Sequence, residues 1–194
     1  MAVRRKEVLY KGKFLELNKL TYLNKNDEES SWEYVSRSGG RKAVVIIAWL
    51  MPSRRILVTS EYRPPISGRE LGFPAGLIDS GESPEQTAIR ELKEETGYTG
   101  TVDIISPPTI SSAGLSDESV YLANVTVDEN ASENKNVKPN LEASEDIETF
   151  LVHKDEINRF INKRTVLGDD KLGSRFAAYL VGMAQWKSSS RDRG

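Results

Sequence analysis

The feature that most constrains this 194-residue chain is the stretch 76–98, GLIDSGESPEQTAIRELKEETGY. Ser83 is a candidate helix N-cap because Pro follows it and Gln stands three residues after it, while Gly97 is placed to end the helix in a left-handed conformation. With a period of about 3.6 residues, three carboxylates share one face of this helix: Glu91, Glu94 and Glu95. Like charges at this spacing destabilise a helix, so the face indicates a site for a hard divalent cation such as Mg²⁺.

The spacing around these carboxylates is more specific than that of a solvated acidic helix face. Gly76 is followed by Glu82, then by Arg90-Glu91-Leu92, Glu94-Glu95 and Gly97-Tyr98. Arg90 lies one turn before Glu94, and it approaches Glu82 once the preceding loop folds back, so it can orient these carboxylates. The pattern resembles the Nudix box at every defined position. The chain is therefore similar to the Nudix hydrolases, and this resemblance implies metal-dependent cleavage of nucleoside diphosphates linked to another group.

Composition narrows the class of partner. The length fits one domain or one domain with a small addition, and 38% hydrophobic residues with 29% charged residues suit a soluble globular protein. A formal charge of −2 argues against nucleic acid as a partner, because no basic excess is present to neutralise a phosphate backbone. The absence of cysteine, of a signal peptide and of a membrane-spanning run predicts a cytoplasmic protein.

Three regions follow from the periodicity. Residues 1–38 predict a small antiparallel β subdomain, with strands within 8–23 and over 31–37. Residues 39–187 predict the main domain, with a continuous apolar strand at 42–50 and two late helices at 154–163 and 172–186, and residues 188–194 predict a polar tail. Strands with helices before and after them predict an α+β protein, an α/β/α sandwich around a mixed sheet, which is also the fold that the Nudix resemblance implies.

The flanking segments resemble the ADP-ribose and ADP-sugar pyrophosphatases among the Nudix hydrolases. The resemblance rests on Trp32-Glu33, Arg37, Tyr62-Arg63-Pro64-Pro65, the run from Phe73 to Asp79, Ser106-Pro107 and Gly114-Leu115-Ser116. It implies a homodimer with exchanged N-terminal strands, in which an aromatic side chain stacks on the adenine. The implied substrate-binding residues are Phe14, Trp32, Glu33, Arg37, Arg63, Gly114, Leu115 and Ser116. The alternatives are a buried strand aromatic for Trp32 and surface salt bridges for Arg37 and Arg63.

The same resemblance implies a metal site with two or three Mg²⁺ ions, for which Mn²⁺ can substitute. Its implied ligands are the backbone carbonyl of Ala75 and the carboxylates of Glu91, Glu94, Glu95 and Glu145. The implied catalytic residues are Glu82, Arg90, Glu94 and Glu145, with either Glu145 or a box glutamate as the general base. Glu142 is a neighbouring alternative to Glu145, and a solvated loop acid is a further one. Gly72 departs from the subfamily, which commonly has Glu there, and Glu70 is the candidate substitute.

The leading functional hypothesis is hydrolysis of ADP-ribose to AMP and ribose 5-phosphate. A broader nucleoside diphosphate-sugar hydrolase, acting on GDP-mannose or ADP-glucose, is the alternative within enzymes. A non-catalytic ADP-ribose sensor would be expected to have a broken box, whereas this box is intact. His153 is the sole histidine, and its place at a predicted strand end favours a surface position over a catalytic one.

Overall fold

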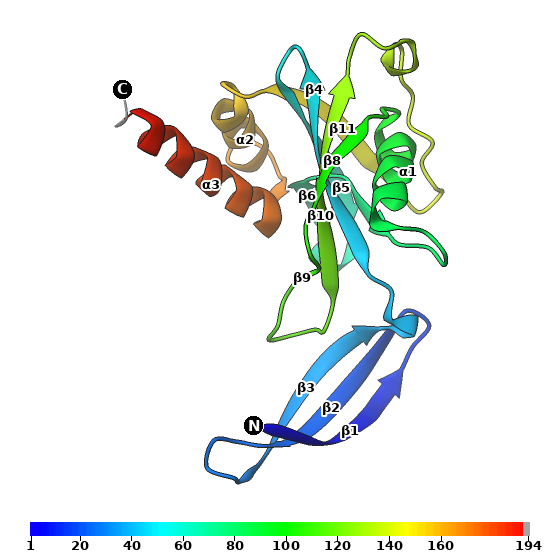
Figure 1. The fold of residues 1–194 in the computed structure, drawn as a ribbon, viewed down its shortest axis with the longest axis vertical. Helices are drawn as coiled ribbons and strands as arrows, with labels where there is room; N and C mark the ends of the chain where they lie inside the picture. Colours follow the sequence, from blue (N-terminus) through cyan, green and yellow to red (C-terminus); the bar gives the residue numbers. More distant parts are fainter. Residues whose placement is uncertain (192–194) are drawn as a thin grey trace.

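The chain forms two parts of unequal size (Figure 1). The computed structural model describes the backbone of residues 1–191 and the side chains of residues 1–184. A three-stranded antiparallel sheet, the N-terminal sheet, contains β1 (Ala2–Lys11), β2 (Leu15–Leu23) and β3 (Glu29–Arg37), and it projects away from the larger body. The predicted antiparallel strands of this region are confirmed, and β1 begins earlier than residue 8.

The larger body is built on a nine-stranded mixed sheet with the main order β12-β6-β5-β4-β10-β8. β11 pairs with β5, β7 with β4 and β9 with β10, and β4 and β10 are parallel. The strands are β4 (Ala43–Met51), β5 (Arg55–Arg63), β6 (Gly68–Gly72), β7 (Ala75–Leu77), β8 (Thr101–Ile105), β9 (Thr109–Ile110), β10 (Ser119–Asp128), β11 (Ile147–His153) and β12 (Lys171–Leu172). The helices are α1 (Pro84–Thr96), α2 (Ile157–Thr165) and α3 (Ser174–Arg191).

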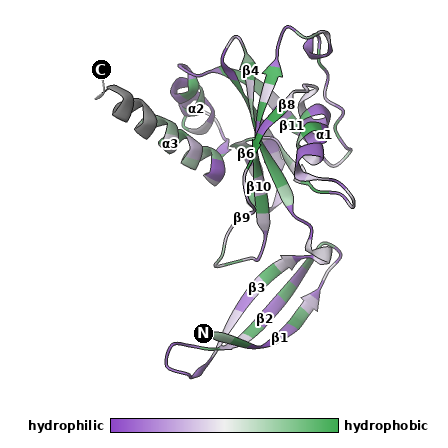
Figure 2. Ribbon diagram, in the orientation of Figure 1, coloured by the Kyte–Doolittle hydropathy of each residue, from purple (hydrophilic) through white to green (hydrophobic). Residues whose placement is uncertain are grey.

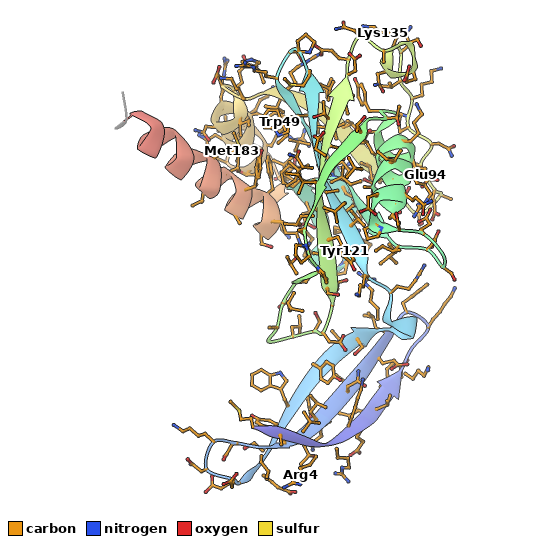
Figure 3. All side chains as sticks on the ribbon, in the orientation of Figure 1. Arg4, Trp49, Glu94, Tyr121, Lys135 and Met183 are labelled. Carbon is orange, nitrogen blue, oxygen red and sulfur yellow. The ribbon has the colours of Figure 1, made fainter. Side chains whose placement is uncertain are left out.

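Helices cover both faces of this sheet, so the predicted α/β/α sandwich is confirmed (Figure 1). One face packs Val44 and Ile46 of β4 against Ala88 and Leu92 of α1. The other face packs β5, β6 and β11 against α2 and α3, where Phe176 is 1% exposed. Hydrophobic residues accordingly concentrate in the central strands (Figure 2), and Figure 3 shows Trp49 and Met183 on the side of the sheet opposite α1.

The sheet opens between its two central strands. β4 and β5 pair at only two positions, Trp49 with Ile56 and Leu50 with Arg55. Beyond them, residues 43–45 of β4 pair with β7 and residues 59–63 of β5 pair with β6. We call this divergence of β4 and β5 the fork. The fork leaves a cavity between the two strands, lined by residues of β4, β5 and β7.

Element boundaries in the last part of the chain differ from the sequence prediction in three places. α2 begins at Ile157 rather than 154, because the Glu156 N–H bonds to the His153 carbonyl and turns the chain first. α3 begins at Ser174, since residues 171–172 pair with β6. The backbone of α3 continues through residue 191, so much of the predicted polar tail is helical, and residues 192–194 lie outside the described residues. Within the described chain, no helix is both long and apolar enough to span a membrane.

Candidate active site

A cavity of about 700 Å³ occupies the fork, and charged side chains dominate its lining. We call it the fork cavity. β4, β5, β7, α1 and β10 form its walls, with Asn140 to Glu145 of the loop after β10 and Arg175 at the start of α3. Its acidic lining residues are Glu61, Asp79, Glu91, Glu94, Glu95, Glu118, Glu142 and Glu145, and its arginines are Arg37, Arg41, Arg63, Arg90 and Arg175. The cavity therefore brings most of the predicted metal and anion ligands together.

Local sequence fixes the helix that supplies three of these carboxylates. The Ser83 hydroxyl accepts a hydrogen bond from the Gln86 N–H at 3.2 Å, and the Gln86 side chain accepts one from the Ser83 N–H at 2.8 Å. Gly97 ends α1 with φ of 78°, as predicted. Because Ala88 and Leu92 are fully buried against the sheet, Glu91 and Glu95 are turned towards β7 and the fork. Figure 3 shows Glu94 on the outer side of α1.

Gly76 explains how Glu91 can come so close to β7. A Cβ atom added at this position would lie 1.9 Å from the carboxyl carbon and Oε1 of Glu91. The backbone φ here is not in the left-handed region, so the requirement is for space alone. Any larger residue would force the Glu91 carboxylate out of the cavity wall.

Arg90 ties the carboxylates of this helix to the preceding loop. Its Nε and Nη2 donate to the two Glu82 oxygens at 2.8 Å each, and its Nη1 donates to Glu91 at 2.8 Å and to Glu94 at 3.0 Å. A further bond runs to the Leu77 carbonyl at 3.1 Å. Hydrogen bonds from Arg90, then from Thr87, lower the pKa of Glu82 to about 2. Arg90 thus orients carboxylates, and Glu82 holds the arginine.

Three buried or half-buried carboxylates of the cavity have raised pKa values. Glu95 is 4% exposed, and burial, followed by the charges of Glu91 and Glu61, raises its pKa to about 9. Burial also raises the pKa of Glu91 and of Glu61 above the ordinary carboxyl value. Glu61, on β5, was missed by the sequence analysis, because a single glutamate in a strand carries no motif. Its position at the fork places it opposite α1.

The acidic loop, residues 140–146, closes the cavity beside α1. The Asn140 N–H donates to the Glu94 carbonyl at 2.7 Å, which attaches the loop to the helix end. The Glu142 N–H donates to the Glu145 carboxylate at 2.8 Å, and both side chains line the cavity. The Glu145 charge contributes to raising the pKa of Glu61, which places it among the carboxylates. Both candidates from the sequence therefore reach the cavity.

The donor set suits a hard divalent cation. Within the described residues no three acidic side chains converge into a finished ligand shell, because Arg90 holds Glu91 and Glu94 and the Ala75 N–H donates to Glu95 at 3.2 Å. The charges of Glu61 and Glu91 raise the pKa of Glu95, and the charge of Glu145 raises the pKa of all three carboxyls. A cation bound among them would relieve this repulsion. Carboxylate oxygens are the ligands that Mg²⁺ prefers, so the residues fit the ion.

Arg37 and Arg63 line the fork cavity and are also salt-bridged. Arg37 Nε lies 2.6 Å from Glu118 Oε1, and Arg63 Nη1 lies 2.7 Å from Glu61 Oε1. Both side chains are more than a third exposed, so their guanidinium groups remain open to a ligand in the cavity. The salt-bridge alternative is therefore compatible with anion binding.

The remaining sequence-predicted residues lie away from the fork cavity. Trp32 donates from Nε1 to the Gly114 carbonyl at 3.3 Å, and the Leu115 carbonyl accepts from the Val35 N–H at 2.9 Å. Trp32 and Ser116 line a second, apolar cavity of about 560 Å³ between the N-terminal sheet and residues 110–117.

Phe14 and Glu33 lie elsewhere again. Phe14 lies 67% exposed in the β1–β2 turn, and its carbonyl accepts from the Ser38 N–H at 2.9 Å. Glu33 neighbours Trp32 on β3 and so faces the opposite side of the sheet. His153 is at the end of β11, near Asp155 and outside the fork cavity. Within one chain, Arg37 joins the carboxylates in the fork cavity, whereas Phe14, Trp32 and Glu33 do not line it.

Comparison with known proteins identifies the larger body. A profile of the NUDIX domain matches residues 40–171. The chain is 34% identical, over 89% of its length, to an ADP-ribose pyrophosphatase of Saccharomyces cerevisiae, of which it covers 76%. It is 33% identical, over 80% of its length, to an ADP-sugar pyrophosphatase of Mus musculus, of which it covers 74%.

A structural comparison agrees with the sequence matches. A solved ADP compounds hydrolase superposes with a TM-score of 0.69 over 97% of this chain and 95% of its own, and at 17% identity this likeness bears on the fold alone. The domain match spans α1, the fork and the acidic loop, and the chain therefore belongs to the NUDIX domain family.

Proposed function

We propose that this protein hydrolyses ADP-ribose to AMP and ribose 5-phosphate with the help of Mg²⁺ or Mn²⁺. The observation that carries the proposal is the gathering of carboxylates, two of them buried on α1, and of arginines in the lining of one cavity. A diphosphate bridged by divalent cations suits such a cavity, because it presents negative charge to arginines and metal to carboxylates. The yeast relative is named an ADP-ribose pyrophosphatase and the mouse relative an ADP-sugar pyrophosphatase, and the yeast name supports ADP-ribose as the substrate.

The chemistry is the attack of a water oxygen on one phosphorus and the breaking of its bond to the bridging oxygen. Divalent ions supply charge neutralisation and a more acidic water when they are bound. Glu91, Glu94, Glu95, Glu145 and the carbonyl of Ala75 are the proposed ligands, with two or three ions per site.

The remaining proposed roles belong to side chains that line the cavity or anchor it. Glu145, or one of the box glutamates, accepts the water proton, and Arg37 and Arg63 bind phosphate oxygens. Arg90 and Glu82 hold the acidic face in the orientation that the reaction needs.

We further propose that the active site is completed in a homodimer. Every residue of β1 is exposed, and this edge strand carries apolar side chains such as Val8 and Tyr10. An exposed edge strand with apolar residues is a ready surface for another copy of the chain. In this dimer the N-terminal sheet is exchanged between subunits, and Trp32 or Phe14 of one subunit contacts the adenine of the partner's substrate. Glu33 and residues 114–116 are proposed to contact the same nucleotide.

A panel of diphosphate substrates tests the function. The purified protein is assayed with Mg²⁺ against ADP-ribose, ADP-glucose and GDP-mannose, and the products are separated by ion-exchange chromatography. We expect the highest kcat/KM for ADP-ribose, with AMP and ribose 5-phosphate in equal amounts. A higher kcat/KM for GDP-mannose would favour the broader nucleotide-sugar hydrolase. Binding of ADP-ribose without turnover on any diphosphate would support a sensor.

A further inference from the structure

Arg175 is a cavity residue to which the box and its flanks assign no role. It is the second residue of α3, and it lines the fork cavity although α3 otherwise packs on the far side of the sheet. Arg175 and Arg63 also line a smaller cavity of about 60 Å³ that adjoins the fork, the side cavity. The start of the C-terminal helix therefore places a guanidinium group next to the candidate reaction site.

The other arginines of the fork cavity are each paired with a carboxylate, whereas Arg175 has no such pair among the side chains that the structure describes. Arg37, Arg41, Arg63 and Arg90 each lie within 4 Å of a carboxylate oxygen. Among the residues whose side chains are described, none forms such an ion pair with Arg175, whose Nη2 donates instead to the hydroxyl of Ser111. Arg175 thus keeps most of its donors for a ligand.

Ser111 and Glu118 hold Arg175 at the cavity wall without neutralising it. The Ser111 N–H donates to the Glu118 carbonyl at 3.0 Å, which fixes the serine beside the glutamate. Burial acts to raise the pKa of Glu118, but Arg37, Ser111 and Arg175 outweigh it and lower that pKa. The Glu118 carboxylate itself is engaged by Arg37 at 2.6 Å. Arg175 is therefore positioned by a neutral contact, and its charge acts on Glu118 without a direct ion pair among the described side chains.

The side cavity gives an anion room to approach. Gly72 and Gly173 line it, and a Cβ added at Gly72 would meet no atom within 4 Å. Glu70 reaches the same cavity, and one of its oxygens is 3.8 Å from Arg63. Arg175 lines both the fork cavity and the side cavity.

We propose that Arg175 binds a phosphate oxygen of the nucleoside diphosphate substrate, so that α3 contributes a specificity-determining residue to the active site. The inference rests on the proposed function, since it assumes a diphosphate in the fork cavity. A planar guanidinium with free donors recognises phosphate oxygens through paired hydrogen bonds. Ser111 is the positioning residue for this contact.

Separate measurement of KM and kcat in variants of Arg175 tests this role. Arg175→Gln is compared with Arg159→Gln, a matched control because Arg159 is an exposed arginine of α2 outside both cavities. We expect Arg175→Gln to raise KM for ADP-ribose by about tenfold with kcat within about threefold, and Arg159→Gln to change neither. Arg175→Lys should recover part of the loss, because lysine keeps the positive charge but lacks the planar guanidinium group.

Two comparisons separate substrate contact from a structural role. Adenosine, which carries no phosphate, should inhibit wild type and Arg175→Gln equally. Ser111→Ala removes the loop contact but keeps the guanidinium, so its KM should rise by less than about threefold. If adenosine inhibition weakens as much as ADP-ribose binding in Arg175→Gln, Arg175 anchors the loop and the proposal is wrong.

A carboxylate introduced at Gly72 gives an independent test. Gly72→Glu places a side chain in open space beside Arg175, so it should raise KM by about tenfold through pairing with that arginine. The same substitution in an Arg175→Gln background should add little. An equal effect of Gly72→Glu in both backgrounds would overturn the proposal, because the new carboxylate would then act elsewhere.

Failure of the proposed function is distinguishable from failure of this inference. Calorimetric titration with ADP-ribose in Ca²⁺ measures binding irrespective of turnover, since Ca²⁺ also takes oxygen ligands. If the wild type binds ADP-ribose but hydrolyses no diphosphate, the function is wrong, while a weaker Kd in Arg175→Gln still supports the contact. An unchanged Kd in Arg175→Gln contradicts the contact whether or not the enzyme turns over.

Discussion

Replacing Glu95 by Gln should stabilise the metal-free protein while abolishing most of its activity. Glu95 is 4% exposed, and its pKa is raised from 4.5 to about 9. Between these two pH values the folded protein holds a proton at Glu95 that the unfolded chain releases. A raised carboxyl pKa contributes full stability below pH 4.5, and that contribution is lost as pH rises through 9. At pH 7, about 2.5 pH units above the ordinary value, about 1.4 kcal/mol per unit gives a penalty of about 3 kcal/mol.

Gln removes the titrating proton and keeps the side-chain shape, including an oxygen that accepts from the Ala75 N–H. Hydration of the cavity reduces the penalty, so we expect Glu95→Gln to raise the free energy of unfolding in EDTA by about 1–3 kcal/mol at pH 7. The gain should vanish near pH 4.5. With saturating Mg²⁺ the order should reverse, because wild type gains binding free energy that the variant lacks. We also expect kcat to fall by about two orders of magnitude or more.

Urea unfolding followed by circular dichroism, at pH 5 and pH 7.5 in EDTA and again in Mg²⁺, measures all of these differences. Glu85→Gln is the control, since Glu85 is an exposed glutamate in the first turn of the same helix and should change stability by less than about 0.5 kcal/mol. If Glu95→Gln is less stable than wild type in EDTA at both pH values, burial of the Glu95 carboxyl does not lower the free energy of unfolding and the reasoning is refuted. Near-normal turnover of Glu95→Gln in saturating Mg²⁺ would falsify its role as a ligand.

Three further predictions concern packing, orientation and assembly. Gly76→Ala puts a Cβ 1.9 Å from the Glu91 carboxyl, so it should destabilise the fold by about 1–3 kcal/mol and lower kcat at least tenfold, as urea unfolding and initial rates would show. Arg90→Lys cannot bridge Glu82, Glu91 and Glu94 together, so kcat should fall about tenfold or more with a normal circular dichroism spectrum; unchanged kcat would contradict the orienting role. Deleting residues 1–38 should give monomers and a higher KM for ADP-ribose while Mg²⁺ binding persists; light scattering decides, and an intact protein of 21.7 kDa that is fully active as a monomer would exclude a shared site.

The parts of the fold that depend on neighbours in sequence were predictable. The capping residues Ser83 and Gly97 and the pairing of Arg90 with Glu82 follow from spacing within one helix and its preceding loop. The strand 43–51 was predictable because its apolar run leaves few alternatives to burial on both faces. The short strands β6 and β7 were not, since segments of five and three residues carry too little periodicity to indicate a strand.

The parts of the site that depend on distant segments were not predictable. Glu61 and Arg175 enter the cavity only because β4 and β5 diverge and the start of α3 reaches the same opening. Neither position belongs to a motif, and their spacing from α1 in the sequence says nothing of their spacing in the fold. The separation of Trp32 from the carboxylates was likewise invisible, because it depends on how the N-terminal sheet docks on residues 114–117.

The fork has a consequence for how this protein opens in solution. Strands that pair along their whole length exchange backbone hydrogens only through large unfolding events, but β4 and β5 share just two paired positions. Glu61 of β5 helps to raise the pKa of Glu95 of α1, because two negative charges this close oppose each other. Amides along β7 and the far end of β5 should therefore exchange with deuterium early in the metal-free protein. A divalent ion held at the fork would link β5 to α1 and β7. Its binding should therefore make the amides around the fork some of the slowest-exchanging in the sheet.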